Sequence, residues 1–195
     1  MGSEDLGGRL PLLPPASLRP EARQLYDRLM GGRLSSTSPF TSRIDTGELI
    51  GPFNAFLHAP AIGGGFVDFH EAEEHSTPLS PRVREIVILS VGAVWGSAYE
   101  TYAHRAIAAQ VGFAPDVAAA LAAGVICEGI SAEERLAQRF ALDLVRDRIV
   151  DDATYLEAER VFGREGLVAL VFVAAAYDAT CVILNAFAVP APSPD

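Results

Sequence analysis

The sequence contains no lysine: its 15 basic residues are all arginine, against 25 Asp and Glu, which gives a formal net charge of -10. A chain without a lysine amine cannot form a Schiff base, so this form of covalent catalysis is excluded. The excess of acidic residues argues against nucleic acid as a partner, because its phosphates would be repelled.

Cysteine is also scarce. Cys127 and Cys181 are far apart, form no C-x-x-C and have no histidine close by in sequence. This spacing argues against a disulfide framework or a structural zinc site and favours a reduced environment. The first ten residues lack the basic and then apolar pattern of a signal peptide. We therefore expect a cytoplasmic protein.

Apolar residues are abundant, at 50% of the chain, and the mean hydropathy is +0.24. This excess favours subunit interfaces in addition to a core. The run from Gly166 to Val189 is long enough to span a bilayer, but Asp178 lies at its centre, where a charge costs at least ~2.5–3.5 kcal/mol. We interpret this run as a buried core helix and expect no membrane partner.

The periodicity of apolar residues predicts an all-α protein of about eight helices in one domain, with no convincing strand. Residues 1–19 are expected to form an extended arm, residues 20–190 the helical domain and residues 191–195 a tail. Ser80 before Pro81 is typical of a helix start, and Ser131 with Glu134 of a capping box. A polar loop follows the first helix, and a helix break is expected near Gly96.

Several motifs argue against common sites. His70 and His75 in "HEAEEH" are five residues apart, about 140° around a helix, and cannot share a metal as the H-E-x-x-H motif does. We interpret this stretch as solvated helix surface and expect no metal site. No G-x-S-x-G surrounds any serine, so the nucleophile elbow of a hydrolase is absent.

The stretch "WGSAYETYAH" places Ser97, Glu100 and His104 at i, i+3 and i+7, within about 60° of one another on one helix face. Two interpretations are open. An exposed Glu–His pair would be a polar strip on the helix surface, and it would stabilise the helix by only about 0.3–0.5 kcal/mol. A buried pair, which the apolar neighbours favour, would have shifted pKa values and could transfer protons.

The segment "RVREIVILSVGAVWGSAYETYAHRAIAAQVG" resembles the carboxymuconolactone decarboxylase family, which is related to alkylhydroperoxidase D. The resemblance rests on R-E-x-x-I-L followed by a Glu four residues before a His. It extends more weakly from "LPLLPP" to "LNAFAVPAP". The resemblance implies a helical bundle of the alkylhydroperoxidase D type and a homo-oligomer built as a dimer, trimer or hexamer.

The chain departs from the peroxidase branch of this family at both thiols. Counting back from His104, the C-x-x-C of that branch falls on Ser97 and Glu100, while its helper Glu falls on Glu85. Without a thiolate at these positions there is no nucleophile to reduce a peroxide. The decarboxylase branch, which needs no cofactor, is similar in having a Glu four residues before the His.

These residues predict acid–base chemistry on a small carbonyl- or carboxylate-containing compound without a cofactor, as in a lyase or isomerase. The expected catalytic residues are His104, Glu100 and Glu85, because an imidazolium held by a carboxylate can donate a proton to a carbanion. Decarboxylation, isomerisation, dehydration and ring closure all remain open. The expected substrate-binding residues are Trp95, Ser97, Tyr99, Tyr102 and Arg84. Two alternatives are a thiol-based redox protein that uses Cys127 or Cys181 and a non-catalytic oligomeric scaffold.

Overall fold

The computed structural model describes residues 6–32, 34 and 38–193. Over these residues the chain forms eight α-helices and, in place of strands, one isolated bridge between Arg43 and Leu49. The predicted all-α class and helix number are therefore confirmed. The helices are α1 (Pro20–Gly31), α2 (Pro52–His58), α3 (Pro60–Ser76), α4 (Pro81–Trp95), α5 (Ala98–Gln110), α6 (Pro115–Ala122), α7 (Ala132–Leu142) and α8 (Asp152–Ala186).

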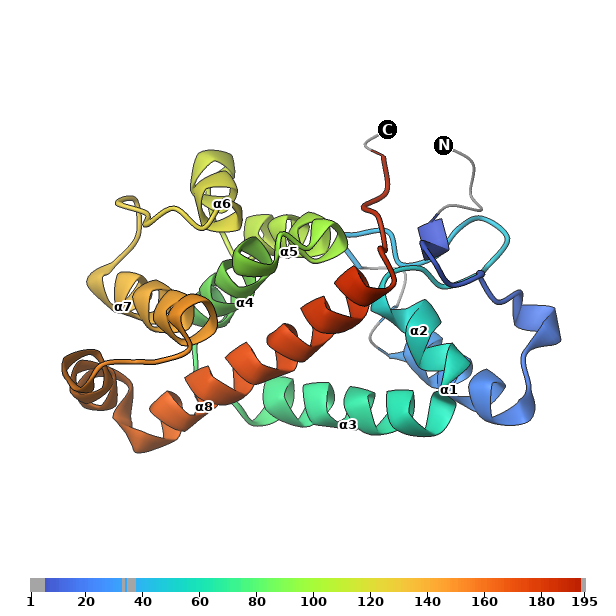
Figure 1. Ribbon diagram of the computed structural model, residues 1–195, viewed down its shortest axis with the longest axis horizontal. Coiled ribbons are helices and arrows are strands. Elements are labelled where there is room, and N and C mark those ends of the chain that lie inside the picture. The colour runs from blue at the N-terminus through green and yellow to red at the C-terminus, as the bar shows by residue number, and fades with distance from the viewer. Residues whose placement is uncertain (1–5, 33, 35–37, 194–195) are drawn as a thin grey trace.

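Helix α8 organises the bundle. It crosses the molecule diagonally, with α3 along one side and the α4–α5 pair along the other, while α1 and α2 lie at one end and α6 and α7 towards the other (Figure 1). The largest apolar core is built from α4, α7 and α8, and includes Val87, Phe140 and Leu170. Separate apolar clusters join α1 to α2 and α3, and α4 to α5 and α6.

The local signals for helix starts and ends act as the sequence predicts. Ser80 caps α4 by accepting a hydrogen bond from the Val83 amide at 3.2 Å. Ser131 and Glu134 form the complete capping box at the start of α7. Gly96 ends α4 with a left-handed φ of 58°, a conformation that favours glycine. This turn reverses the chain, so that α5 packs back against α4.

Helix α8 contains a kink and a long apolar part. Gly163 has a φ of 69°, which separates the segment that starts at Asp152 from the apolar remainder of α8. By length and composition α8 could cross a membrane, but half of its apolar window is buried inside the structure. The buried residues include Leu170 and Tyr177, which pack in the main core. This packing agrees with the interpretation as a core helix.

The described part of the N-terminal arm lies on the helical body. The Arg9 amide donates a hydrogen bond to the carbonyl of Phe187 at 2.7 Å, just beyond the end of α8. Leu6 and Leu12 pack against a cluster that contains Tyr99 and Leu184. The described part of the arm thus packs against the C-terminal end of α8 and the residues that follow it.

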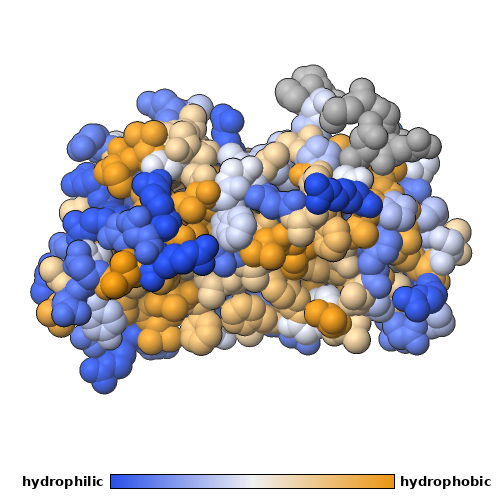
Figure 2. Space-filling view, in the orientation of Figure 1, coloured by the Kyte–Doolittle hydropathy of each residue, from blue (hydrophilic) through white to orange (hydrophobic). Residues whose placement is uncertain are grey.

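The outward side of α8 carries an exposed apolar stripe. Val168, Val171 and Phe172 are 41–51% exposed, and Val182 extends the same helix face. An area of hydrophobic residues is visible over this helix (Figure 2). A contiguous apolar surface of this kind typically marks an interaction site.

We expect this stripe to form a subunit interface in a homo-oligomer, because association would remove its side chains from water. Light scattering at micromolar concentration should give a mass above the 20.7 kDa of one chain. Phe172→Arg should shift the protein towards the monomer, whereas Ile62→Arg, at a 78% exposed apolar position outside the stripe, should not. A monomeric wild-type protein would contradict this expectation.

Candidate functional site

The turn between α4 and α5 places three buried ionisable side chains together. Glu85 of α4 approaches His104 of α5, with 2.6 Å between Glu85 Oε1 and His104 Nδ1. Glu100, one turn before His104, lies with its Oε1 3.3 Å from Nε2. The exposed fractions of the Glu85, Glu100 and His104 side chains are 2%, 4% and 10%. The imidazole is therefore held between two carboxylates in a largely dry environment.

Close packing of the two helices makes this arrangement possible. An added Cβ at Gly92 of α4 would lie only 3.4 Å from Cγ of Glu100. A Cβ at this position would be in ordinary van der Waals contact with Glu100, so Glu100 packs directly against the backbone of α4.

The two carboxylates determine the charge state of His104. Burial by itself lowers its pKa, because it disfavours the charged imidazolium. The negative charges of Glu85 and Glu100 and the hydrogen bond to Glu85 outweigh burial and the opposing charge of Arg84, so the pKa is raised above 6.5. The site therefore favours the imidazolium, which donates a proton from each nitrogen.

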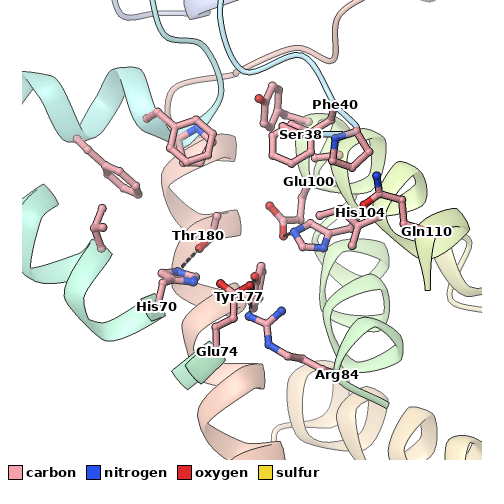
Figure 3. A pocket seen from close by; sticks show the side chains of 18 residues that line it. Ser38, Phe40, His70, Glu74, Arg84, Glu100, His104, Gln110, Tyr177 and Thr180 are labelled. Carbon is pink, nitrogen blue, oxygen red and sulfur yellow. Dashed lines mark hydrogen bonds and ion pairs between the residues drawn. The ribbon is translucent and has the colours of Figure 1, made fainter. Parts of the chain in front are cut away.

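His104 and Glu100 open into a pocket of about 280 Å³ between α2, α3, α4, α5 and α8. Figure 3 shows His104 and Glu100 on one side of this pocket and His70 on the other. Glu85 does not line it and contacts His104 from behind. The apolar part of the wall consists of Pro39, Phe40, Pro52, Phe53, Phe56, Val67, Tyr99, Ala103 and Ile107. A small ring compound would contact aromatic and aliphatic surface next to the imidazole.

Arg84 lies in the wall near Tyr177 of α8. Its guanidinium forms a two-pronged ion pair with Glu73 of α3, with Nε–Oε1 at 2.9 Å and Nη2–Oε2 at 2.6 Å. Nη2 also donates to the Tyr177 hydroxyl at 3.1 Å. The Tyr177 ring lies edge-on to the His104 ring, with 5.0 Å between the ring centres. This network fixes the wall of the pocket beside the proposed proton carrier.

The interpretation of "HEAEEH" as solvated surface is wrong for two of its residues. His70 and Glu73 are buried, whereas His75 is exposed. His70 Nε2 lies 3.1 Å from the hydroxyl oxygen of Thr180, a residue of α8 that is 110 positions away. That hydroxyl donates its one hydrogen to the carbonyl of Ala176, so its lone pairs accept from Nε2–H of His70. His70 thus lines the pocket in a fixed orientation.

The structure brings together some of the sequence-predicted residues and separates others. Tyr99, Arg84, Glu100 and His104 line the pocket. Ser97 and Tyr102 lie instead along a separate hollow, with residues of α5 and α6. Trp95 lines neither hollow, and its indole donates to Asp178 at 2.7 Å.

The expected shared face of Ser97, Glu100 and His104 does not form. Ser97 is the N-cap of α5 and has extended backbone angles, φ -77° and ψ 109°, so helical periodicity does not apply to it. Its side chain is fully buried and lies against the thiol of Cys181 from α8. Ser97 is therefore separated from the pocket, although Glu100 reaches it.

The polar loop after α1 supplies part of the wall that sequence reasoning missed. Ser38, Pro39 and Phe40 line the pocket, whereas residues 35–37 lie outside the described part of the chain. Thr41 is held by two hydroxyls: its carbonyl accepts from Tyr99 at 2.8 Å and its amide donates to Tyr102 at 3.1 Å. Tyr102 therefore supports the wall from outside the pocket.

Neither a metal-binding cluster nor a solvent-exposed thiol is found in the described residues. No group of three or more His, Cys, Asp or Glu side chains among them is placed to hold a metal ion. Cys127 and Cys181 are both free and buried. Burial raises the pKa of Cys181, so its sulfur remains a thiol.

The part of the chain that carries this Glu–His–Glu cluster matches a known protein family. Residues 60–141 match the model of the Carboxymuconolactone decarboxylase family. The resemblance to this family seen in the sequence is therefore confirmed over these residues. The two thiols of the peroxidase branch are absent from positions 97 and 100.

Solved structures support the same fold. A protein from Ralstonia eutropha JMP134, described as an alkylhydroperoxidase AhpD core and uncharacterized peroxidase-related protein, is 20% identical with a TM-score of 0.74, covering 95% of this chain and 92% of its own. An uncharacterized peroxidase-related protein from Silicibacter sp. TM1040 is 15% identical with a TM-score of 0.76, covering 99% and 96%. At these identities the likeness shows the fold alone.

A third solved structure has the same fold over a shorter span. The debrominase Bmp8, in a cysteine-to-alanine variant bound to 2,3,4-tribromopyrrole, is 14% identical with a TM-score of 0.63. The match covers 72% of this chain and 77% of the debrominase. No curated protein matches the chain by sequence.

The charge balance around His104 predicts how its imidazole titrates. NMR titration of the four histidines should give a pKa above 6.5 for His104, the signal being assigned by its loss in His104→Gln. Glu85→Gln and Glu100→Gln should each lower this pKa, with the larger change for Glu85→Gln because Glu85 makes the shorter contact. Glu71→Gln, on the outside of α3, should leave it unchanged.

The raised pKa of His104 also makes the folding stability depend on pH. Because the folded-state pKa is raised, protonation of His104 stabilises the fold fully below about pH 6.5, the ordinary pKa of an unfolded histidine. This contribution is lost as the pH rises through the folded-state pKa. Urea unfolding should therefore show that the free-energy difference between wild type and His104→Gln decreases over that range. A difference that grows with pH would contradict the raised pKa.

Proposed function

We propose that this protein is a cofactor-independent acid–base catalyst, a lyase or isomerase that acts on a small carbonyl- or carboxylate-containing compound. The observation that carries the proposal is the position of His104. Its Nδ1 is bound by buried Glu85, while its Nε2 lies beside Glu100 at the wall of the pocket. A group of fixed orientation and raised pKa next to a small cavity is suited to general acid catalysis.

Each member of the cluster has a distinct role in this proposal. Glu85 orients the imidazole and stabilises its positive charge from behind the pocket wall. His104 donates the Nε2 proton to a carbanion or enolate, and Glu100 accepts a proton or holds the imidazolium. In a decarboxylation, the electron pair of the breaking C–C bond would pass into the adjacent carbonyl system, and His104 would then protonate the carbon. In an isomerisation, the same groups would remove and return a proton.

The size and walls of the pocket support a small substrate. Its volume of about 280 Å³ and its aromatic lining suit a compound of one ring. The debrominase structure, which holds 2,3,4-tribromopyrrole, supports the idea that a protein of this fold can enclose such a ring.

A screen of lactones, β-keto acids and muconate-like compounds in D₂O tests this function. NMR detects both product formation and the entry of deuterium at carbons next to a carbonyl, so it reports proton transfer of either kind. On a compound that reacts, His104→Ala should lose about 10²–10⁴-fold in rate while it stays folded. His75→Ala, which replaces an exposed histidine of α3, is the matched control and should retain activity. Full activity in His104→Ala would refute the proposal.

A thiol-based redox function is the alternative that one contact favours. Cys181 contacts Ser97, and the negative charge of Glu100 acts on its thiol. The thiols of the peroxidase branch fall on positions 97 and 100, so Cys181 lies close to both. Its burial and raised pKa oppose the thiolate that such chemistry needs.

The acid–base proposal therefore predicts two unreactive cysteines. Ellman's reagent should modify neither Cys127 nor Cys181 in the native protein and both after denaturation, because both are buried. The double variant Cys127→Ala, Cys181→Ala should keep the wild-type rate on any compound that reacts. A folded double variant without turnover would favour thiol chemistry instead.

A further inference from the structure

One end of the pocket is lined by residues of the polar loop after α1. Ser38 and Phe40 lie at the end of the pocket that is away from Arg84 (Figure 3). The Phe40 ring is edge-on to the ring of Tyr99, with 6.5 Å between the ring centres. The position of this loop therefore determines how far a ligand beside His104 can extend.

Two tyrosines of α5 hold this loop through the backbone of Thr41, the residue after Phe40. The Tyr99 hydroxyl donates to the Thr41 carbonyl at 2.8 Å, and the Thr41 amide donates to the Tyr102 hydroxyl oxygen at 3.1 Å. The two tyrosines are about one helical turn apart and lie on either side of Glu100 in the sequence. The helix that carries the proposed proton acceptor therefore also fixes the loop at the end of the pocket.

The Tyr99 ring is itself held in place by close packing. Gly51, just before α2, has a φ of 67°, and a Cβ added there would lie only 2.4 Å from the Tyr99 ring. The ring is therefore confined between the backbone at Gly51 and the side chain of Phe40. Burial holds the pKa of Tyr99 well above its ordinary value of 10.0, so its hydroxyl keeps the proton that it donates to Thr41.

Tyr102 differs from Tyr99 because it acts on the pocket only from outside. It lies along the separate hollow between α5 and α6 and does not line the pocket, so it does not touch a ligand there. Thr41 is exposed, and water can therefore bind its amide when the Tyr102 hydroxyl is removed. The fold does not depend on this hydrogen bond, whereas the position of the loop does.

We propose that Tyr102 is a positioning residue that sets the size of the substrate. By holding Thr41 it keeps Phe40 in place and restricts the pocket to compounds of one ring. This inference rests on the function proposed above for the same pocket and adds a size limit to it. A volume of about 280 Å³ is at the small end of ligand sites, so a shift of one wall changes which rings fit.

Two neutral amides test the size limit: benzamide, which has one ring, and 2-naphthamide, which has two fused rings. Binding is followed through the imidazole NMR signal of His104, which lines the pocket. The second ring of 2-naphthamide adds apolar surface, which would favour its binding at an open site. The wild-type protein should nevertheless bind benzamide more tightly, because Phe40 occupies the space that the second ring needs.

Two tyrosine-to-phenylalanine changes provide the variant and its matched control. Tyr102→Phe should raise the affinity for 2-naphthamide relative to benzamide by about two- to tenfold, the effect of one hydrogen bond. Tyr155→Phe, which removes the hydroxyl of a 45% exposed tyrosine near the start of α8, should leave this ratio unchanged. A Tyr102→Phe variant that binds both amides equally less well has only lost stability, and this result would overturn the positioning role.

The inference is also overturned if the wild-type protein binds 2-naphthamide as tightly as benzamide, if Tyr102→Phe keeps the wild-type ratio, or if neither amide binds. A failure of the acid–base function is a separate result, because the ratio of affinities requires no turnover. A compound that reacts equally fast with wild type and His104→Ala would refute the acid–base function and leave this ratio unchanged.

Discussion

The burial of His104 between two carboxylates is the constraint on which the site depends. A buried carboxylate without a partner is strongly unfavourable, so Glu85 and Glu100 in the core require the imidazolium, and the imidazolium requires them. This mutual requirement fixes how α5 packs on α4 and determines which nitrogen of the imidazole faces the pocket. The left-handed turn at Gly96 is the backbone feature that permits it, and Glu100 packs against α4 next to Gly92.

Tyr177 of α8 connects this cluster to the opposite wall. Its ring is edge-on to both His104 and His70, with 5.0 Å between ring centres in each case, and its hydroxyl accepts from Arg84. The long helix that closes the core therefore also sets the separation between the two histidine-bearing walls. Stability and proposed function share this helix.

The sequence predicted those features that depend on neighbours along the chain. The caps at Ser80 and Ser131 and the break at Gly96 are local, and the approach of Glu85 to His104 follows from that break and the family resemblance. Prediction from the sequence failed where a side chain packs against a residue from a distant segment. His70 is covered by Thr180, 110 residues away, and helical spacing within "HEAEEH" contains no information about that contact. Ser97 was misplaced because a cap residue does not follow the helical angle of 100° per residue.

The central claim is that His104 carries the proton between Glu85 and Glu100, and neutron diffraction tests it most directly. An ordinary imidazole is half protonated near pH 6.5. In crystals exchanged into D₂O at that acidity, both Nδ1 and Nε2 of His104 should carry deuterium at more than half occupancy. The carboxylates of Glu85 and Glu100 should carry none. A His104 ring with one bare nitrogen in most molecules, or a deuteron located on Glu85, would contradict the account.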